Sequence, residues 1–380
     1  MRVLVVASRY LPHRGGVETV ASHLAQELVR KGHEVLVVAQ RYPRRLPGQE
    51  VIEGIQTRRL MFLYPRLSFL RQGRIDLAMA SVWYLLSTTW VLHRIIRSFQ
   101  PDVVNLHYLG SPGRFLNLAH SLSGFPWVVS LHGGDVDAEP YRSRHGRRLF
   151  ETVTTNANVV TACSKALAEE AIRLSSGLRS KLQVIYNGVD TRLFASAPPY
   201  RHPTPYFAAV GQLVEHKGFD LLIDAFADVA TDSPAVDLII AGDGACGAKL
   251  RDLARQRGVD GRVHFLGRVS EAQVASLIAG SLFVAMPSRR EPFGIVALEA
   301  MAAGHKVLAT QVGGVPEFVN PDYNRLIAPD RSSWRQALAE ALQERSNGVS
   351  NANRAWAEQF SWDRVAARYV EAYHEAISIG

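Results

Sequence analysis

Short apolar runs alternate with amphipathic stretches along the whole chain. The runs are rich in Val, Ile, Leu and Ala, and the stretches between them repeat apolar residues at helical spacing. Such runs are typical of strands that are buried on both faces of a parallel sheet. We predict ten strands: Val3–Ala7, Glu34–Ala39, Val103–Leu106, Val128–Leu131, Val159–Ala162, Phe207–Val210, Leu238–Ala241, Val263–Leu266, Leu282–Ala285 and Val307–Thr310. Helices are predicted between most of them, for example at Val17–Lys31 and Gly218–Val229.

The ten strands form two series, separated by a proline-rich segment. Residues 197–205 contain four prolines, a composition typical of a linker. We therefore expect an α/β protein of two doubly wound, Rossmann-like domains, whose parallel sheets face each other across a cleft. Ligands bind beyond the carboxyl ends of the strands in such sheets, so binding and catalytic residues are expected in the loops that follow strands.

One apolar stretch resembles a membrane span in composition. Leu77–His93 has no charged residue and contains Trp83 and Trp90. It is shorter than the roughly 20 residues that a span requires, and Ser, Thr and His interrupt it. We predict a helix that is buried or lies on a membrane surface, and a true span is the less favoured alternative.

Composition narrows the class of protein. A chain of 380 residues with 47% hydrophobic and 21% charged residues is typical of a soluble globular protein with two domains. The apolar run at Met1–Ser8 is too short for a signal peptide and is predicted as the first strand. The two cysteines, Cys163 and Cys246, lack metal-ligand spacing, which favours a reducing cytoplasm without disulfides. Cys163 is expected to be buried at a strand end.

The charge is distributed unevenly. Residues 1–199 hold 25 Lys and Arg against 14 Asp and Glu, a net +11, whereas residues 200–380 hold 18 against 21, a net −3. The basic half has no zinc-ligand spacing, no aromatic-rich RNA-binding signature and no heptads, so a nucleic-acid partner is not expected. An anionic membrane surface or a phosphate-bearing acceptor explains the charge better.

Two carboxylates eight positions apart mark the stretch Glu291–Glu299. Good helix formers follow Gly294, and Gly304 can end the helix, so we predict a helix between these two glycines. Glu291 then lies in the loop before the helix, and Glu299 lies about a turn and a half inside it. A helix N-terminus attracts phosphate, and nearby carboxylates accept hydrogen bonds from hydroxyl groups. Hydroxyls beside a phosphate fit a nucleotide sugar, although a plain surface helix would have the same pattern.

Three other loops after predicted strands carry candidate residues. Gly15 and Gly16 precede a helix, where a flexible backbone can close on an anion. His132 ends a strand ahead of two glycines, and Lys217 lies near a helix N-terminus, where its charge suits a diphosphate. A simple turn, a structural histidine and a solvated lysine are the respective alternatives.

Two motifs suggest competing functions. Asp135 and Asp137 form a D-x-D pair that could hold a divalent ion, but a metal-free diphosphate site with a cation and helix N-termini is available elsewhere. Gly242–Gly247 is a G-x-G-x-x-G segment behind a strand, with Asp260 at a suitable distance for a dinucleotide fingerprint. That fingerprint belongs at the first strand of its domain, and this strand is the second.

These motifs together resemble the retaining glycosyltransferases of family 4, which have the GT-B fold. Glu291–Glu299 resembles the E-x7-E motif, Gly15-Gly16 the glycine pair that faces the donor diphosphate, and His132 the active-site histidine. Further matching segments are Tyr186–Asp190 with Tyr186 in place of the usual proline, the Ala-Gly-Asp-Gly turn at 241–244, Val263–Gly267, Ala309–Glu317, and a tail helix from Phe360 to Ile377.

The resemblance also implies the domain boundaries. Residues 1–197 would be the acceptor-binding domain, 198–205 the linker and 206–360 the nucleotide-sugar-binding domain. Residues 361–380 would form a helix that crosses back to the first domain.

One position departs from the family. The family pattern Gly-Arg-Leu…Lys-Gly places an arginine and a lysine on the diphosphate, and this chain has Gln212 where the arginine is expected. An amide can donate a hydrogen bond but lacks the charge, which puts donor affinity, donor type or activity in question. Arg289 or Arg290 could compensate.

The resemblance implies the following roles. Glu299 would accept the ribose hydroxyls, Glu291 the donor-sugar hydroxyls, and Lys217 would stabilise the departing diphosphate. His132 would position the donor sugar. The backbone of Phe293, Gly294 and Ile295 would hold sugar and phosphate, with Gly15, Gly16, Gln212 and Gly267 completing the donor site. The acceptor hydroxyl would attack from the front face, and domain closure would exclude water.

The expected activity is transfer of a hexose from a UDP- or GDP-sugar to an acceptor hydroxyl, without a metal or another cofactor. The acceptor would be a lipid-linked sugar, a polysaccharide precursor or a small molecule. A binding subunit with weakened catalysis remains an alternative, in which Gln212 is the residue that impairs activity. A phosphorylase would need a pyridoxal phosphate lysine and a longer chain.

A cytoplasmic protein at the inner face of a membrane is expected. The arginines at 58, 59, 66, 71 and 74 lie among apolar residues of the segment 60–70, and a monotopic surface uses such a combination. The alternatives are that these arginines are solvated loop residues, or that they bind a soluble phosphorylated acceptor.

Overall fold

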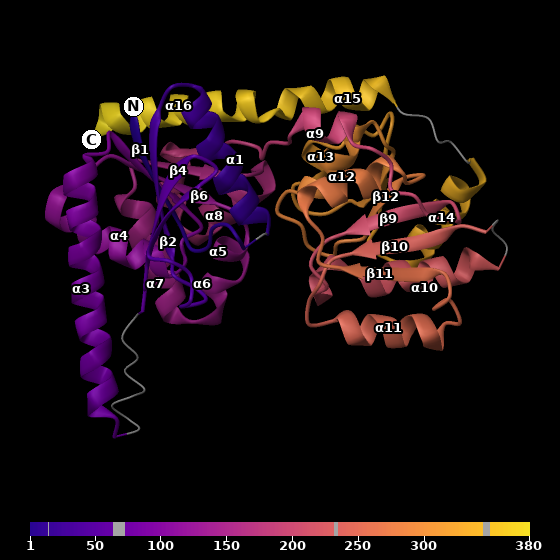
Figure 1. The fold of residues 1–380 in the computed structure, drawn as a ribbon, viewed down its shortest axis with the longest axis horizontal. Coiled ribbons are helices and arrows are strands. Elements are labelled where there is room, and N and C mark those ends of the chain that lie inside the picture. The colour runs from indigo at the N-terminus through magenta and orange to yellow at the C-terminus, as the bar shows by residue number, and fades with distance from the viewer. Residues whose placement is uncertain (14, 64–72, 232–234, 345–349) are drawn as a thin grey trace. The chain divides into compact units, whose positions relative to one another are not determined.

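The chain divides into two compact units in the computed structural model, which describes residues 1–13, 15–63, 73–231, 235–344 and 350–380 (Figure 1). The first unit comprises Met1–Tyr186 and Trp362–Gly380, and the second comprises Asn187–Ser361. Residues 187–197, expected in the first domain, thus belong to the second unit. The reason is that α9 (Thr191–Ser196) packs against α13 (Ile295–Ala303).

An eight-stranded sheet forms the centre of the first unit. Its order is β3-β4-β2-β1-β5-β6-β7-β8, and every neighbouring pair is parallel except β3 with β4. The strands are β1 (Arg2–Ala7), β2 (Glu34–Gln40), β3 (Gln49–Ile52), β4 (Ile55–Leu60), β5 (Val103–His107), β6 (Trp127–Leu131), β7 (Val159–Ala162) and β8 (Leu182–Val184). The central strands are buried over nearly their whole length, as expected for a sheet covered on both faces.

Helices cover this sheet. They are α1 (Gly16–Arg30), α3 (Ile75–Phe99), α4 (Gly110–Ser123), α5 (Gly134–Asp137), α6 (Glu139–Arg142), α7 (Arg144–Asn156), α8 (Lys165–Leu174), the short 3-10 helix η1 (Ser176–Ser180) and α16 (Trp362–Ile379). The last of these packs against α1, β5 and β6 although it lies at the far end of the chain. The side-chain amide of Asn105 donates a hydrogen bond to the Tyr373 hydroxyl at 2.7 Å, inside this packing.

The second unit is built on a six-stranded parallel sheet of order β11-β10-β9-β12-β13-β14. Its strands are β9 (Tyr206–Val210), β10 (Asp237–Ala241), β11 (Val263–Gly267), β12 (Val284–Met286), β13 (Val307–Thr310) and β14 (Arg325–Ile327). Its helices are α9, α10 (Phe219–Ala230), α11 (Gly247–Gln256), α12 (Glu271–Ala279), α13, α14 (Arg331–Glu344) and α15 (Asn351–Ala357), with 3-10 turns η2 (Glu215–Lys217), η3 (Val315–Glu317) and η4 (Glu358–Phe360). The core of this unit is aromatic and aliphatic, with Phe207, Phe226 and Trp334 fully buried.

The predicted fold class is confirmed. Each of the ten predicted strands is present, and Cys163 is buried directly after β7 as expected. Four strands were not predicted: β3, β4, β8 and β14. β8 and β14 have only three residues each, and polar residues make up half of β3 and most of β4, so all four lack the continuous apolar run that marks the others.

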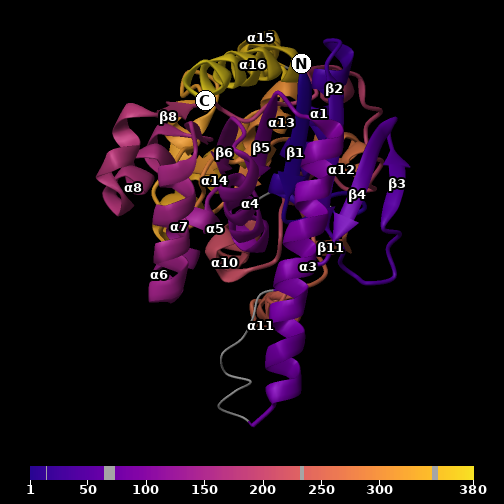
Figure 2. The ribbon, with the colours of Figure 1, turned by 90° about the vertical axis from the view of Figure 1, so that its left-hand side faces the viewer.

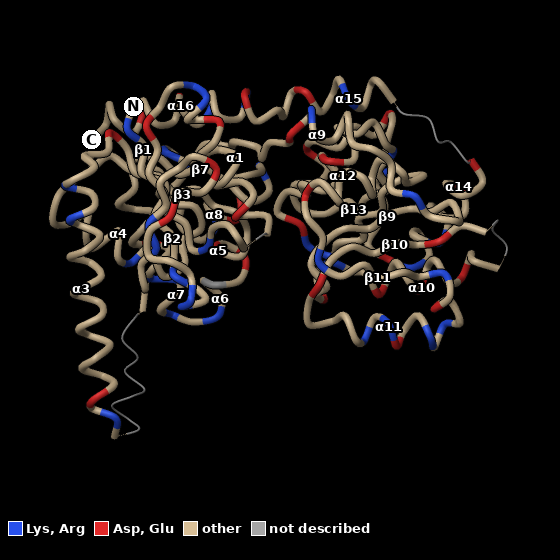
Figure 3. Tube along the Cα trace, in the orientation of Figure 1, with Lys and Arg blue, Asp and Glu red and all other residues tan. Residues whose placement is uncertain are grey.

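Helix α3 is longer than the apolar stretch that predicted it, and it is not buried. Among the described helices it is the one long and apolar enough to cross a membrane, by length and composition alone. Its first half extends beyond the sheet of its own unit (Figure 2), and charged residues lie only near its two ends (Figure 3). Large apolar side chains are exposed along it: Ile75, Met79, Val82, Trp83, Tyr84, Leu86 and Trp90.

Candidate active site

The loop between β12 and α13 has the geometry that the sequence predicted. Helix α13 begins at Ile295 with Gly294 as its N-cap residue, and it ends at Gly304. Gly294 has a φ of 105°, a conformation that side-chain-bearing residues rarely adopt. No side chain caps the first turn of α13. The Ala297 amide donates to the Gly294 carbonyl oxygen, which leaves the N–H groups of Ile295 and Val296 for a ligand, as in helix N-termini that bind phosphate.

Lys217 and Glu291 form an ion pair in the second unit. The Lys217 Nζ lies 2.5 Å from Oε2 of Glu291, and the Ser288 hydroxyl donates a hydrogen bond to the same oxygen at 3.0 Å. Glu291 is 6% exposed, so its carboxylate is removed from water and held by two donors. Sequence analysis did not single out Ser288, because one serine in a loop carries no distinguishing signal.

The sheet order explains why these residues meet. Lys217 follows β9 and Glu291 follows β12, and these two strands are neighbours although the residues are 74 positions apart. The strand order also reverses between β9 and β12, which makes this the topological switch point of the sheet. Ligands bind at such points in doubly wound proteins.

A neighbouring loop fixes the Glu291 backbone. The Gly314 amide donates a hydrogen bond to the Glu291 carbonyl oxygen at 3.1 Å. A Cβ atom at Gly313, whose φ is 52°, would lie 2.0 Å from the same oxygen. Only glycine fits this close approach, so the loop after β13 is part of the support for the Glu291 carboxylate.

Glu299 lies within α13 and is largely enclosed. Burial, and to a lesser extent the nearby Glu271, raises the pKa of the Glu299 carboxyl to about 8. Such a shift is typical of a carboxyl without a compensating cation, and it is common at functional sites. The Phe293 side chain is buried and stacks on Phe318 with ring centroids 4.4 Å apart. Its backbone is therefore the part of Phe293 that a ligand can reach.

The loops after β9, β10 and β11 meet at the same edge of the sheet. The Gly242 amide donates a hydrogen bond to the Gly267 carbonyl oxygen at 2.8 Å, and the Leu213 amide donates one to Asp243. A Cβ atom at Gly242 would lie 1.8 Å from the Gly211 carbonyl oxygen. A Cβ atom at Gly244 would likewise lie 2.5 Å from the Leu213 carbonyl oxygen, so loop packing explains the first two glycines of the G-x-G-x-x-G segment without a dinucleotide.

Gln212 is exposed in this group of loops. Arg289, proposed as a substitute for the missing arginine, forms a two-bond ion pair with Asp220 at 2.7 and 2.8 Å and donates to the Glu215 carbonyl oxygen. The guanidinium group of Arg289 is therefore directed at Asp220 and the Glu215 carbonyl oxygen, and in this arrangement it does not replace the charge that position 212 lacks.

His132 lies at the carboxyl end of β6 in the first unit, half buried. Its Nε2 atom is 3.0 Å from Nδ1 of His107, and the two rings stack with centroids 5.2 Å apart. Burial lowers the pKa of His132 to about 4, and burial beside His132 lowers the pKa of the fully buried His107. Both rings are therefore neutral near pH 7. One ring donates a hydrogen bond to the other, and neither carries a charge.

His107 was not predicted as a site residue. It is the last residue of β5, and His132 directly follows β6, so their similar positions at strand ends were the available signal. The next residue, Tyr108, has a φ of 65°, a left-handed conformation that is costly for a tyrosine. Within the described residues, Nε2 of His107 has no hydrogen-bond partner.

Asp135 supports the loop around His132. Its carboxylate accepts hydrogen bonds from the backbone amides of His132 and Gly133, at 3.1 and 2.9 Å. Burial raises its pKa to about 7, whereas these hydrogen bonds lower it. Since Asp135 is 1% exposed and faces its own loop, the D-x-D segment is poorly suited to hold a metal.

Gly15 and Gly16 lie at the start of α1, after the loop that follows β1. Gly15 is the N-cap residue of α1, without a side-chain cap, and both glycines are exposed. A Cβ atom at Gly15 would lie 2.6 Å from a carboxylate oxygen of Glu18. The strand order of the first sheet reverses between β1 and β5, so the loops with Gly15 and His107 follow the two strands of its switch point.

Comparison with known proteins identifies the class. Residues 14–193 match the family model described as Glycosyltransferase Family 4, and residues 195–359 match Glycosyl transferases group 1. An uncharacterized glycosyltransferase of Methanocaldococcus jannaschii is 30% identical over 100% of this chain and 99% of its own length. The chain belongs to family 4 of the glycosyltransferases, which have the GT-B fold.

One similar protein and two solved structures are named for different sugar substrates. The GDP-mannose:cellobiosyl-diphosphopolyprenol alpha-mannosyltransferase of Xanthomonas campestris is 31% identical over 73% of this chain and 74% of its own length. Among solved structures, sucrose-phosphate synthase from Thermosynechococcus elongatus has a TM-score of 0.81 at 20% identity, covering 100% of both chains. HepE of Anabaena in complex with UDP-glucose has a TM-score of 0.75 at 20% identity, with 98% of each chain covered.

Proposed function

We propose that this glycosyltransferase moves a hexose from a nucleotide diphosphate sugar to an acceptor hydroxyl with retention of configuration. The observation that carries the proposal is the Lys217–Glu291–Ser288 cluster beside the uncapped N-terminus of α13. It combines a cation and free N–H groups, which suit a diphosphate, with carboxylates that suit sugar hydroxyls. The HepE structure holds UDP-glucose on the same fold, which supports a donor of this class.

Each group of the second unit has a distinct role. Lys217 and the first amides of α13 stabilise the negative charge that develops on the leaving diphosphate, an electrostatic effect that is often the largest in catalysis. Glu291, held by Lys217 and Ser288, accepts hydrogen bonds from the donor sugar. Glu299 accepts them from the ribose, with the backbone at Phe293, Gly294 and Ile295 beside it.

The first unit acts on the sugar and the acceptor. His132 is neutral and can donate or accept one hydrogen bond to the donor sugar, and His107 fixes its ring orientation. Gly15 and Gly16 offer backbone amides to the diphosphate. Retention follows from front-face attack by the acceptor hydroxyl, in which the departing diphosphate takes the proton and no protein nucleophile is used.

A lipid-linked acceptor at a membrane surface fits the first unit best. Most of the exposed apolar residues of α3 recur at intervals of three or four positions and so share one face: Ile75, Met79, Trp83, Leu86 and Trp90. Arg94 and Arg97 lie towards the end of the helix. The mannosyltransferase of Xanthomonas campestris is named for a diphosphopolyprenol acceptor. The arginine segment that suggested a membrane is weaker support, since Arg59 is 3% exposed and paired with Glu50, and Arg74 pairs with Asp76. Arg66 and Arg71 lie outside the described residues.

Thermal shift with a panel of nucleotides and nucleotide sugars tests donor binding. A ligand that binds only the folded state stabilises it and so raises the melting temperature. At a ligand concentration of 100 times the Kd, the free energy of unfolding rises by about 2.7 kcal/mol. Slow hydrolysis of the best donor without acceptor then tests chemistry. Lys217→Ala should lower the hydrolysis rate about 100-fold or more, as loss of one oxyanion donor does, and Lys249→Ala, an exposed lysine on α11, should not.

The outcomes separate enzyme from binder. Binding with hydrolysis that depends on Lys217 supports the proposed transferase. Binding without any turnover favours the weakened binding subunit that Gln212 suggests. No stabilisation by any nucleotide would overturn the proposal.

A further inference from the structure

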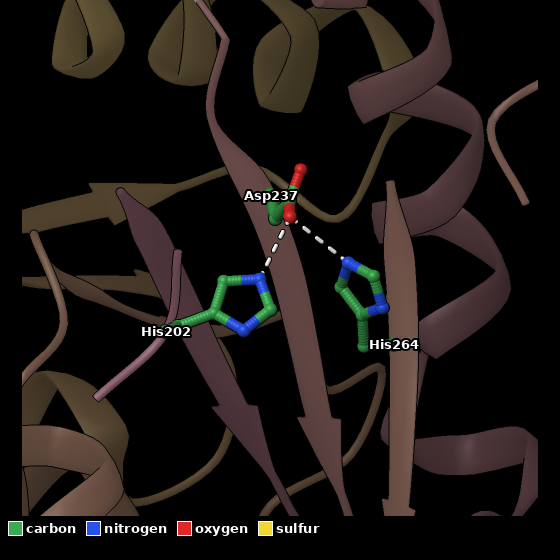
Figure 4. A group of neighbouring side chains, drawn as sticks. All are labelled: His202, Asp237 and His264. Atoms are coloured by element: carbon green, nitrogen blue, oxygen red, sulfur yellow. Dashed lines mark hydrogen bonds and ion pairs between the residues drawn. The ribbon is translucent and has the colours of Figure 1, made fainter. Parts of the chain in front are cut away.

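Three potential metal ligands converge in the second unit, away from the candidate active site. The Nε2 atoms of His202 and His264 lie 2.8 and 2.9 Å from the same carboxylate oxygen of Asp237. Their ligand atoms all lie within 4.8 Å of one another. Figure 4 shows both imidazole rings directed at this oxygen, with a dashed line from each.

The sheet brings these residues together. Asp237 is the first residue of β10, and His264 is paired in register with Ile239, two positions further along the same strand. Because alternate residues of a strand share a face, Asp237 and His264 lie on the same face of the sheet. His202 comes from the segment ahead of β9. All three side chains are thus at the amino-terminal edge, whereas Lys217 and Glu291 follow strand ends at the carboxyl edge, about 13 Å away along a five-residue strand.

We propose that His202, Asp237 and His264 bind a divalent transition-metal ion, with Zn²⁺ as the best match. Imidazole nitrogens and a carboxylate oxygen are ligands that zinc and its late first-row neighbours prefer. Ligand atoms around a tetrahedral zinc stand about 3.3 Å apart, given bond lengths of about 2.0–2.1 Å. The observed 2.8 and 2.9 Å separations between nitrogen and oxygen would widen by about half an ångström. The two histidine nitrogens already lie within 4.8 Å of each other, so rotation of the side chains can bring all three ligand atoms around one ion.

A hydrogen-bonded cluster is the competing explanation, and the titration below distinguishes the two. Asp237 is 7% exposed, and the side-chain donors to its carboxylate among the described residues are these two histidines alone. A divalent cation bound by the same three groups would compensate the charge of a buried carboxylate. No described residue hydrogen-bonds Nδ1 of either ring, so both rings can move their proton to Nδ1 and offer Nε2 to the metal.

The site would have a structural effect. His202 belongs to the proline-rich segment that leads into β9, and a shared ion would fix this segment to β10 and β11. A metal that binds only the folded chain raises its stability by mass action. Three protein ligands leave one position for water or another ligand.

Zinc titration of the full chain tests the proposal. The protein, free of any histidine tag and dialysed against EDTA and then chelator-free buffer, is titrated with Zn²⁺ by calorimetry. We expect one equivalent to bind and to raise the melting temperature. His202→Gln and His264→Gln each keep a hydrogen-bond donor near Asp237 but lose a good ligand, so each should weaken zinc binding by about tenfold or more. His374→Gln, at an exposed histidine outside the cluster, should leave it unchanged.

Cobalt provides a readout that needs no variant. Co²⁺ bound by two imidazoles and a carboxylate gives visible absorption bands, and Zn²⁺ should remove them at one equivalent. A wild-type protein that binds no zinc, or glutamine variants that bind it as tightly as the wild type, would overturn the proposal. If a variant fails to fold, the cobalt bands of the wild-type protein decide: their presence supports the site and their absence refutes it.

Discussion

Two glutamates of the candidate site are held in different ways at the residue scale. Glu291 is fixed by Lys217 and Ser288, and its backbone is fixed by the loop after β13. Glu299 has no partner of this kind among the described residues, and burial raises its pKa to about 8. A carboxyl in that condition gains hydrogen bonds when a ligand supplies hydroxyl groups. The two residues should therefore respond to different parts of the donor.

Replacement of each glutamate by alanine separates these contacts. Glu299→Ala should weaken binding of free UDP or GDP as well as of the sugar nucleotide, because the ribose is common to both. Glu291→Ala should weaken chiefly the sugar nucleotide. Each lost charged hydrogen bond is worth about 1.5–3 kcal/mol in calorimetry. Equal effects of the two changes on free nucleotide would contradict this division.

The protonation state of Glu299 predicts a pH dependence. Its raised pKa means that the carboxyl is mostly protonated at pH 7 in the free protein. Ribose hydroxyls donate to the ionised form, so binding should lower this pKa and release a proton. Affinity for free nucleotide should then rise with pH and level off above about pH 8.

Calorimetry in two buffers of different ionisation enthalpy counts the released protons. Glu299→Gln keeps a hydrogen-bonding group without titrating, so the difference between wild type and variant excludes titration of the nucleotide phosphate. The same pKa shift makes the Glu299 contribution to folding stability fall as pH rises from the ordinary glutamate pKa of 4.5 to about 8, since the unfolded chain ionises first. Proton uptake, or release that persists in the variant, would contradict the ribose assignment.

At the scale of whole elements, continuous apolar runs made most strands predictable. β1, β5 and β6 are buried on both faces, so most of their residues are apolar. The glycines that bound α13 were also sufficient to place its ends. The Lys217–Glu291 contact was not predictable from spacing, because it depends on which strands become neighbours. The contact between His107 and His132 was not predicted for the same reason.

Helix α3 shows the limit of a composition argument. Its apolar stretch predicted a helix that is buried or lies on a membrane, and the exposed side chains exclude burial of that face. A length of 25 residues also satisfies the length of a span, but Ser81, Thr88 and Thr89 are buried against the protein. A helix that lies on a membrane surface is expected to pack one face on its own protein and to expose an apolar face.

Vesicle co-sedimentation tests the α3 face. The wild-type protein should bind vesicles that contain anionic lipid, and binding should fall with salt because arginines contribute about 1 kcal/mol each near the surface. Trp83→Ser with Trp90→Ser should weaken binding, whereas Val51→Ser with Tyr323→Ser, exposed apolar residues elsewhere, should not. A wild-type protein that stays in the supernatant at low salt would favour a soluble acceptor.

At the scale of the whole molecule, each unit carries its candidate residues on loops after strands at the switch point of its own sheet. The proposed zinc ligands lie at the opposite edge of the second sheet. Two separate consequences follow for metal ions. A metal at His202, Asp237 and His264 would affect stability, and the diphosphate would rely on Lys217 and the N-terminus of α13 for positive charge.

Chelation with EDTA should therefore lower the melting temperature of a zinc-loaded sample while donor turnover persists. A magnesium-dependent enzyme assayed in the same buffer confirms that chelation is effective. His202→Gln should show no further loss of melting temperature in EDTA, because its metal site is already impaired, and it should keep its turnover. Complete loss of turnover in EDTA, restored by Mn²⁺ or Mg²⁺ in both wild type and His202→Gln, would place a required metal at the donor. Lys217 and the α13 N-terminus would then be insufficient for the leaving diphosphate, and metal-independent transfer would be wrong.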